Sequence, residues 1–269
     1  MLRRFTLFAI ICALLAGAGL VPRQAAARQN DKNITAENVG EAVIFVYGTR
    51  PGLEQIRRNG VERGRMTRAG NDGRTEESSY ERRFIRGETS AKDKIRIDQK
   101  SPTVEYSLVY GDGRAWGLLN GAPFTPREET TAEFLSQKWH GIDALLRYKE
   151  DGSTLTRVGK EKHMGLDLHV LDLTDKEGRR TRYYISTKTL RILWLEYEQT
   201  PVGGSKPVKY MRKFYDYRSA QNTLVPFRTV LYEDGKQTQE THILTVTYGV
   251  KMEDSLFQNP EAPATASKP

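Results

Sequence analysis

Five pairs of an acidic residue followed by glycine recur along the chain, and they constrain the fold more than any other feature. They are Asp72-Gly73, Asp112-Gly113, Asp151-Gly152, Glu177-Gly178 and Asp234-Gly235. Glycine adopts a positive φ without a Cβ clash and aspartate tolerates one, so such pairs suit tight hairpins. Parallel strands would need long crossover connections instead. The turns therefore predict an antiparallel meander, in a fold that is mainly β with a few helices (α+β).

The segments between the turns have the residue pattern of strands. Apolar and polar residues alternate from Leu166 to Val170 and, after an expected bulge, on to Leu173. β-favouring residues are also frequent in 181–200, 209–219, 224–235 and 241–252. Pro226 has no amide hydrogen for a ladder, so its strand is expected to begin there or to lie at an edge. Residues 60–100 are rich in Arg and Glu, which predicts strands with one solvated face and a thin apolar one.

Helices are predicted in two places before the first strand. Residues 35–48 have Thr35 as a candidate N-cap and Gly48 as a stop. The apolar stripe of this segment consists of Val39, Ala42, Val43 and Val46. A shorter helix is expected to start at Pro51 and to run through Ile56.

A further helical region is predicted near the middle of the chain, within 130–152. Thr130 and Glu133 have the spacing of a capping box, and Gly141 is expected to divide the helix in two. One stripe consists of Leu135, Trp139, Ile142 and Leu146. The additional apolar residues are Phe134, Leu145 and Tyr148. This surplus indicates either a helix that is buried all round or the lining of a cavity.

Residues 1–27 have the three parts of a cleavable secretion signal. Arg3 and Arg4 precede an apolar run, and three alanines at 25–27 suit a signal peptidase. The run is shorter than the ~20 apolar residues that a membrane anchor needs. Cys12, the single cysteine, lies within the run, so the mature chain is expected to have no disulfide, thiolate site or cysteine nucleophile. We therefore expect a soluble periplasmic protein.

The histidines, the sequence motifs and the charge pattern of the chain favour neither catalysis nor nucleic-acid binding. The four histidines, His140, His163, His169 and His242, form no HExxH motif and no metal-binding pair on a helix. The chain also lacks a GxSxG, SxxK or GxxxxGK[ST] motif. Although the net charge is +8, glutamates interrupt the arginines between 57 and 86. We therefore predict no enzyme, no cofactor, no metal and no nucleic-acid partner.

Three segments carry a resemblance to a known superfamily. In 110–126 a DG turn precedes an aromatic residue and further strand residues, and 159–198 reads as a hairpin opened by glycine. The segment 213–260 supplies closing strands and ends in D-x-x-F-x-x-P. Together with the order of signal, helix, strands, helical insert and strands, this resembles the LolA/LolB-type superfamily of periplasmic lipoprotein carriers. That superfamily also contains the RseB-type stress sensors.

The resemblance covers a domain at 31–258, followed by a tail at 259–269 that we expect to be disordered. It implies an incomplete antiparallel β-barrel, or strongly curved sheet, around helices that act as a lid over an apolar cavity. The implied ligand-binding residues are Trp116, Phe134, Leu135, Trp139, Ile142, Leu145, Leu146, Tyr148 and Trp194. The implied partner of this monomer is a lipid or an acylated lipoprotein. The alternative is a periplasmic sensor or assembly module on the same scaffold, with membrane-associated protein partners.

Overall fold

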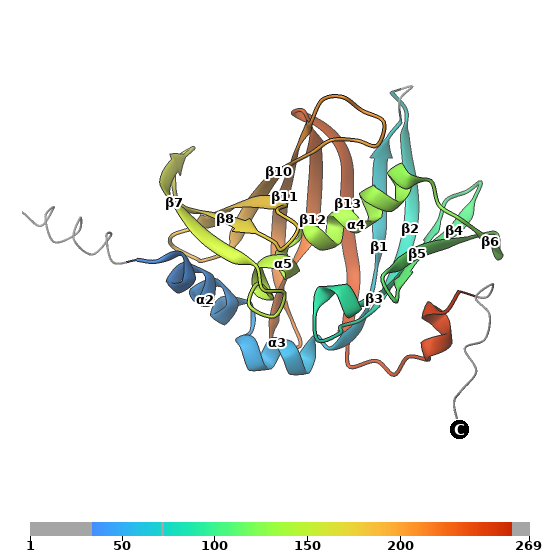
Figure 1. The fold of residues 1–269 in the computed structure, drawn as a ribbon, viewed down its shortest axis with the longest axis horizontal. Coiled ribbons are helices and arrows are strands. Elements are labelled where there is room, and N and C mark those ends of the chain that lie inside the picture. The colour runs from blue at the N-terminus through green and yellow to red at the C-terminus, as the bar shows by residue number, and fades with distance from the viewer. Residues whose placement is uncertain (1–33, 71–72, 260–269) are drawn as a thin grey trace, which may run out of the picture. The chain divides into compact units, whose positions relative to one another are not determined.

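Antiparallel hairpins dominate the computed structural model, which describes residues 34–70 and 73–259 (Figure 1). The predicted signal at 1–27, Cys12, Asp72 and the tail beyond Asn259 lie outside the described residues. The strands are β1 (Asn59–Ala69), β2 (Thr75–Ile85), β3 (Lys94–Lys100), β4 (Glu105–Gly111), β5 (Arg114–Leu119), β6 (Ala122–Phe124), β7 (Thr154–His163), β8 (Leu166–Thr174), β9 (Arg180–Ser186), β10 (Ile192–Gln199), β11 (Val208–Ala220), β12 (Thr223–Glu233) and β13 (Lys236–Tyr248). The helices are α2 (Ala36–Tyr47), α3 (Arg50–Ile56), α4 (Glu128–Trp139) and α5 (Ile142–Leu146), with 3-10 turns η1 (Ser90–Lys92) and η2 (Asp254–Phe257).

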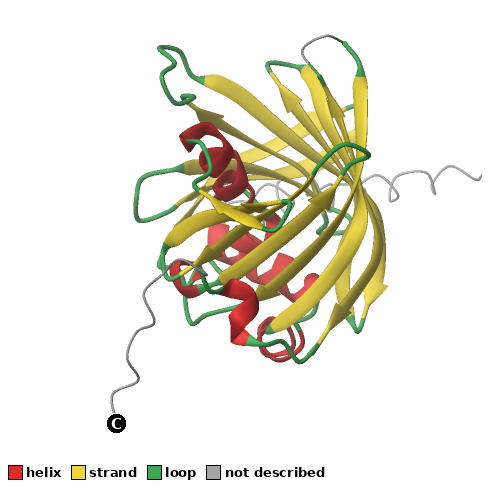
Figure 2. Cartoon of the chain, turned by 90° about the vertical axis from the view of Figure 1, so that its right-hand side faces the viewer, coloured by secondary structure: helices red, strands yellow, loops and turns green. Residues whose placement is uncertain are grey.

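The thirteen strands form one sheet in the order β6-β5-β4-β3-β2-β1-β13-β12-β11-β10-β9-β8-β7. Strands that follow one another in the chain are paired, with one exception: β6 and β7 do not pair and form the two edges of the sheet. In addition, the first strand, β1, pairs with the last, β13. The segment with α4 and α5 connects these two edges, and the sheet does not close into a barrel. Figure 2 shows the strands curving around the helices. The predicted curved antiparallel sheet with a few helices is confirmed.

Three of the five acidic-glycine pairs lie between sequential strands, as predicted, and so does Gly73, the described member of a fourth pair. In β4–β5 and β12–β13 both members of the pair have positive φ, with Asp112 at 51° and Gly113 at 74° in the first of these hairpins. The prediction is wrong for Asp151-Gly152, which follows α5 and precedes β7. There Gly152, with φ 65°, donates its N–H to the carbonyl of Lys149 and ends a helical turn. A glycine with positive φ ends a helix as readily as it closes a hairpin, so the dipeptide alone does not separate the two.

Two details of the strands differ from expectation. The bulge expected in β8 lies on its partner β7, where the register shifts between Arg157 and Gly159. Pro226 neither begins β12 nor lies at an edge, because β12 begins at Thr223 between β11 and β13. The ladder to β13 begins only at Arg228, so the missing N–H of Pro226 interrupts no bond on that side.

The helix α2 has the predicted limits, but its buried face is rotated. Val39 and Val43 are buried as expected, together with Ile44 and Tyr47. The expected stripe residues Ala42 and Val46 are only half-buried. Tertiary contacts set this orientation: the Tyr47 hydroxyl lies 2.8 Å from that of Tyr217 and accepts the backbone N–H of Ile192 at 3.2 Å.

The mid-chain helical region divides at Gly141, as predicted, into α4 and α5. The predicted capping box is wrong, because α4 begins at Glu128 and places Thr130 inside the first turn. Glu128 and Glu129 both lie in that turn, where a carboxylate interacts favourably with the positive, N-terminal end of the helix dipole. The helix therefore starts three residues, almost a full turn, earlier than the capping pattern indicates.

The charged segment 60–100 forms strands with two different faces. On the face away from the helices, cross-strand ion pairs join Arg63 to Glu81 and Arg83 to Asp98, and Arg83 also pairs with Glu81 within β2. On the other face, a few aromatic and aliphatic side chains are buried, among them Phe84 and Ile95. This agrees with the predicted solvated face and thin apolar face.

Candidate functional site

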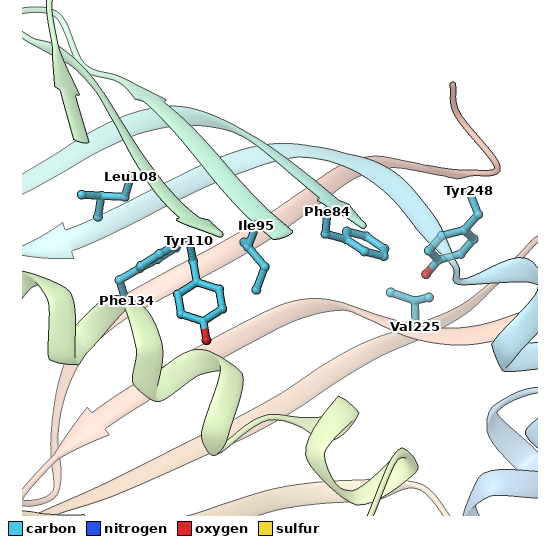
Figure 3. Packing of buried hydrophobic residues seen from close by; sticks show 7 residues of the cluster. All are labelled: Phe84, Ile95, Leu108, Tyr110, Phe134, Val225 and Tyr248. Carbon is cyan, nitrogen blue, oxygen red and sulfur yellow. The ribbon is translucent and has the colours of Figure 1, made fainter. Parts of the chain in front are cut away.

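The concave face of the sheet holds an apolar cluster beneath α4, which we call the α4 cluster. Its buried members are Phe84, Ile95, Leu108, Tyr110, Phe134, Val225 and Tyr248 (Figure 3). They come from β2, β3, β4, α4, β12 and β13, so only the tertiary fold brings them together. Phe134 is the side chain by which α4 enters this cluster.

A second set of apolar side chains packs against the α4 cluster without being fully buried. These residues are Ile56, Ile97, Tyr106, Phe124, Leu135, Ala220, Phe227, Ile243 and Val246. They lie on eight different helices and strands. Their exposed area gives the concave side an apolar surface that an additional apolar group could cover.

The seven helical site residues predicted from the sequence lie in different surroundings in the structure. Phe134 and Leu135 contact the α4 cluster. Leu145, Leu146 and Tyr148 are buried at the other end of the helical segment, where the Tyr148 hydroxyl donates to Glu41 on α2 at 2.9 Å. The remaining two residues of this set, Trp139 and Ile142, are half-buried.

The two predicted strand tryptophans lie on the opposite face of the sheet. Trp116 pairs with Val109, and both pack against Phe257 of η2, whereas Tyr110 next to Val109 faces α4. Trp194 stacks on Tyr184 with ring centroids 4.5 Å apart, again on the face away from the helices. The prediction that all nine residues line one site is therefore corrected for these two. Strand parity separates them, because successive side chains point to opposite faces.

Beside the α4 cluster lies a pocket of about 180 Å³ between β2–β3, the α4–α5 break and the β8–β9 turn, which we call the charged pocket. Phe84 and Ile95 line it and also belong to the α4 cluster. Its cationic lining residues are Arg82, Arg86, Lys138, Arg147, Lys176 and Arg179. Its carboxylates are Asp93, Asp143, Asp151, Asp175 and Glu177. The pocket is thus apolar on one side and charged on the others.

Two ion-pair systems fix the walls of the charged pocket. Arg147 binds both carboxylate oxygens of Asp93 at 3.0 Å and donates to the Gly87 carbonyl at 2.9 Å. Asp143 lies 2.6 Å from Arg86 and 3.3 Å from Arg57. The first system is almost fully buried, whereas 43% of the Asp143 side chain remains exposed.

Lys138 lies on the same pocket with its ammonium group 3.9 Å from the centroid of the Tyr110 ring. Burial lowers the pKa of Lys138 to about 8, although the carboxylates of Asp93 and Asp151 act in the opposite direction. The side chain is thus cationic at neutral pH and partly removed from water. A cation in that setting interacts more strongly with an anion than a solvated one does.

His140, between α4 and α5, is buried and has no role as an acid or base near neutral pH. Its Nδ1 lies 2.7 Å from the Thr181 hydroxyl, and Arg212 donates to its backbone carbonyl at 3.2 Å. Burial, together with the charges of Arg212 and Arg179, lowers the pKa of His140 to about 3. Within the described residues, no group of three or more His, Cys, Asp or Glu side chains could hold a metal ion.

The cations of the charged pocket were not predicted as site residues. Arg82 and Arg86 belong to a segment whose alternating charges read as a solvated surface, and Lys138 reads as the exposed face of a helix. One signal was available: Arg82 and Phe84 share one side of β2, and Arg86 follows at the same spacing just after the strand, so an aromatic residue is flanked by arginines. No helix in the described part of the chain is long and apolar enough to cross a membrane.

Comparisons with known proteins identify similar folds and no sequence relatives. No protein-family profile and no curated protein sequence matches the chain. A DUF1329 family protein from Desulfovibrio piger is similar with a TM-score of 0.58 at 12% identity, over 84% of this chain and 98% of that one. A LolA superfamily protein from Nitrosomonas europaea gives 0.57 at 12% identity, over 84% and 98%. A domain named for outer membrane lipoprotein sorting, from Vibrio parahaemolyticus, gives 0.57 at 12% identity, over 83% and 95%.

Proposed function

Starting from the LolA-like fold of this chain, we propose that it is a periplasmic binding protein that carries a lipid or the acyl chain of a lipoprotein. The observation that carries the proposal is the half-buried apolar surface around the α4 cluster. The acyl chain would lie between the concave face of the sheet and α4. The periplasmic location rests on the sequence of residues 1–27, and the role as a binder instead of an enzyme rests on the absence of catalytic motifs in the sequence.

The helix α4 is suited to act as a lid because it is weakly anchored. Phe134 is its single large buried side chain, whereas the much shorter α5 buries Leu145 and Leu146. The break at Gly141 separates the two helices, so α4 can move while α5 stays in place.

The energies involved are comparable with those of a short stretch of acyl chain. Removing Phe134 from the α4 cluster costs about 1.5–3 kcal/mol of apolar burial. Each buried methylene of a ligand returns about 0.8 kcal/mol, so roughly four methylenes offset the displaced ring. A longer acyl chain would then stabilise the position of α4 displaced from the sheet.

The test is native mass spectrometry of protein isolated gently from the periplasm, followed by titration with a fluorescent fatty acid. The informative variant is Leu135→Asp, which places a charge at the half-buried edge of the α4 cluster. Leu166→Asp, at a 48% exposed leucine at the start of β8 and outside the α4 cluster, is the matched control. We expect co-purified lipid and probe binding for wild type and control, and loss of both in the Leu135 variant. Absence of lipid and of probe binding in the wild type would refute the carrier function.

A second function is favoured by one observation, the filling of the concave face by side chains. The charged pocket measures about 180 Å³, below the ~300 Å³ at which ligand pockets usually begin. A sensor or assembly module on this scaffold needs no hollow interior and would use the sheet or helices to contact a membrane-associated protein. It predicts lipid-free protein that binds no fatty-acid probe, with Leu135→Asp folding and behaving like the control.

A further inference from the structure

We propose that the charged pocket binds the anionic headgroup of the amphiphile whose chain lies at the α4 cluster, so that the ligand is a carboxylate or phosphate lipid and not a neutral one. This assignment rests on the proposed function and specifies its ligand class. It follows from three features of the pocket: an excess of arginine around one carboxylate, a half-buried lysine with no ion-pair partner, and a wall shared with the apolar cluster.

The first feature is the set of guanidinium groups around Asp143. Arg57 and Arg86 both form ion pairs with this one carboxylate. Arg82 lines the same pocket with its guanidinium carbon 4.7 Å from the centroid of the Phe84 ring, and no ion pair of Arg82 occurs within the described residues. Three cations thus surround a single carboxylate, which leaves an excess of positive charge on this wall.

The geometry of Arg86 strengthens this feature. Its side chain is 10% exposed, so it is largely removed from water. Its Nη2 lies 2.6 Å from Oδ1 of Asp143 and is engaged by that carboxylate. A guanidinium has five N–H donors, so Arg86 can keep this contact and still donate to an anionic oxygen in the pocket.

The second feature is Lys138 on the helical wall. Its ammonium group lies over the Tyr110 ring and forms no ion pair within the described part of the chain. The neighbouring Asp93 is already bound by Arg147 at both oxygens. Asp151 accepts the backbone N–H of Ser90 at 2.6 Å. Lys138 and Arg82 are therefore the two half-buried cations that a ligand could engage without breaking an ion pair between described residues, whereas Lys176, also without one, is exposed to solvent.

The third feature is the contact between charge and apolar surface. Phe84 and Ile95 line the charged pocket and are also members of the α4 cluster. A headgroup in the pocket would thus be continuous with a chain that lies along the cluster. A volume of about 180 Å³ suits a headgroup and excludes a whole lipid.

The test compares cis-parinaric acid with its methyl ester, two fluorescent probes with the same chain and different head charge. We expect the wild type to bind the acid about tenfold more tightly, the effect of one charge-assisted hydrogen bond. Arg82→Gln and Lys138→Gln should each reduce this preference several-fold, and the double variant should abolish it with the ester affinity unchanged. Arg65→Gln and Lys149→Gln are matched controls at exposed, ion-paired residues and should keep the preference.

The remaining outcomes separate the two proposals. Equal binding of acid and ester, or a preference that survives in the double variant, overturns the headgroup assignment and leaves the carrier function standing. Binding of neither probe refutes the carrier function and the assignment with it. Competition by inorganic phosphate or butyrate as effective as that by parinaric acid would show a site for free anions and overturn the amphiphile assignment. Arg82→Lys keeps the charge and should retain the preference, which separates a charge effect from a folding defect.

Discussion

The imidazole of His140 lies flat on the ring of Tyr197, with centroids 3.9 Å apart and an interplanar angle of 2°. Tyr197 in turn stacks on Tyr210 at 5.0 Å and 9°. These three rings join the break between α4 and α5 to β10 and β11. Protonation of the buried imidazole would disturb this contact, because the charge would be desolvated and would lie near Arg212.

We expect His140 to make the protein less stable as the pH falls through the mildly acidic range. In the unfolded chain its pKa is near 6.5, whereas burial lowers the folded pKa to about 3. Between these values the unfolded state binds one proton more than the folded state. The free energy of unfolding should therefore fall by up to about 1.4 kcal/mol for each pH unit.

Urea unfolding at about pH 7.5, 6 and 5 measures this dependence. In His140→Gln the free energy of unfolding should no longer fall with pH above pH 5, a range in which few carboxylates titrate. His242→Gln, at a half-exposed histidine on β13, should keep the wild-type slope. Equal slopes in all three proteins would contradict the prediction.

Removal of Arg147 should destabilise the fold severely. Arg147→Met leaves the carboxylate of Asp93 buried without its bidentate partner, and breaking such a pair costs about 3–5 kcal/mol. Arg65→Met breaks an exposed pair with Glu77 and should cost less than about 1 kcal/mol. Chemical denaturation measures both. Asp93→Asn in the Arg147→Met background should recover part of the loss, and failure to recover any would show that packing of Arg147 dominates.

Valine at a hairpin glycine should cost about 1–2 kcal/mol or more, because a β-branched residue is strained at positive φ. Gly113, with φ 74° between β4 and β5, and Gly178, with φ 81° between β8 and β9, are the positions to test. Arg114→Val, one residue after Gly113 and within a strand, is the control and should leave the thermal midpoint nearly unchanged. Stability equal to wild type at both glycines would contradict the turn assignment.

The preference for an anionic probe should weaken at alkaline pH. Burial lowers the pKa of Lys138 to about 8, so its charge is lost as the pH rises through that value. The charged groups that act on it are Asp93, Asp151, Arg147 and Arg179. We expect the ratio of acid to ester affinity to fall between about pH 7 and 9 in the wild type. In Lys138→Gln the ratio should be low and constant, and a parallel fall in that variant would exclude Lys138 as the titrating group.

The mature protein should begin at or near Arg28 and have no covalently attached lipid. The three alanines before Arg28 suit a signal peptidase, and Cys12 lies inside the apolar run, away from the cleavage point. Intact-mass measurement of periplasmic material decides this. A mass that includes residues 1–27, or a lipid adduct on an N-terminal cysteine, would rule the prediction out.

Local sequence determined most of the elements and their order. The acidic-glycine pairs at 112–113 and 234–235 close hairpins because positive φ is a property of the dipeptide itself. Gly141 divides α4 from α5, and α2 ends before Gly48, for similarly local reasons. The resemblance to LolA-type carriers likewise followed from the order of these elements and agrees with the observed fold.

The tertiary structure decided which side chains share a surface. Arg57 meets Asp143 across 86 residues of sequence, and Phe134 meets Tyr110 because the helical insert folds back over the sheet. Trp116 was predicted to share that surface and lies on the other face. A strand's pattern shows that its two faces differ, but which face the helices cover depends on pairing between distant strands and on packing. The charged pocket is therefore a product of the fold, and the spacing of Arg82, Phe84 and Arg86 was the one sign of it in the sequence.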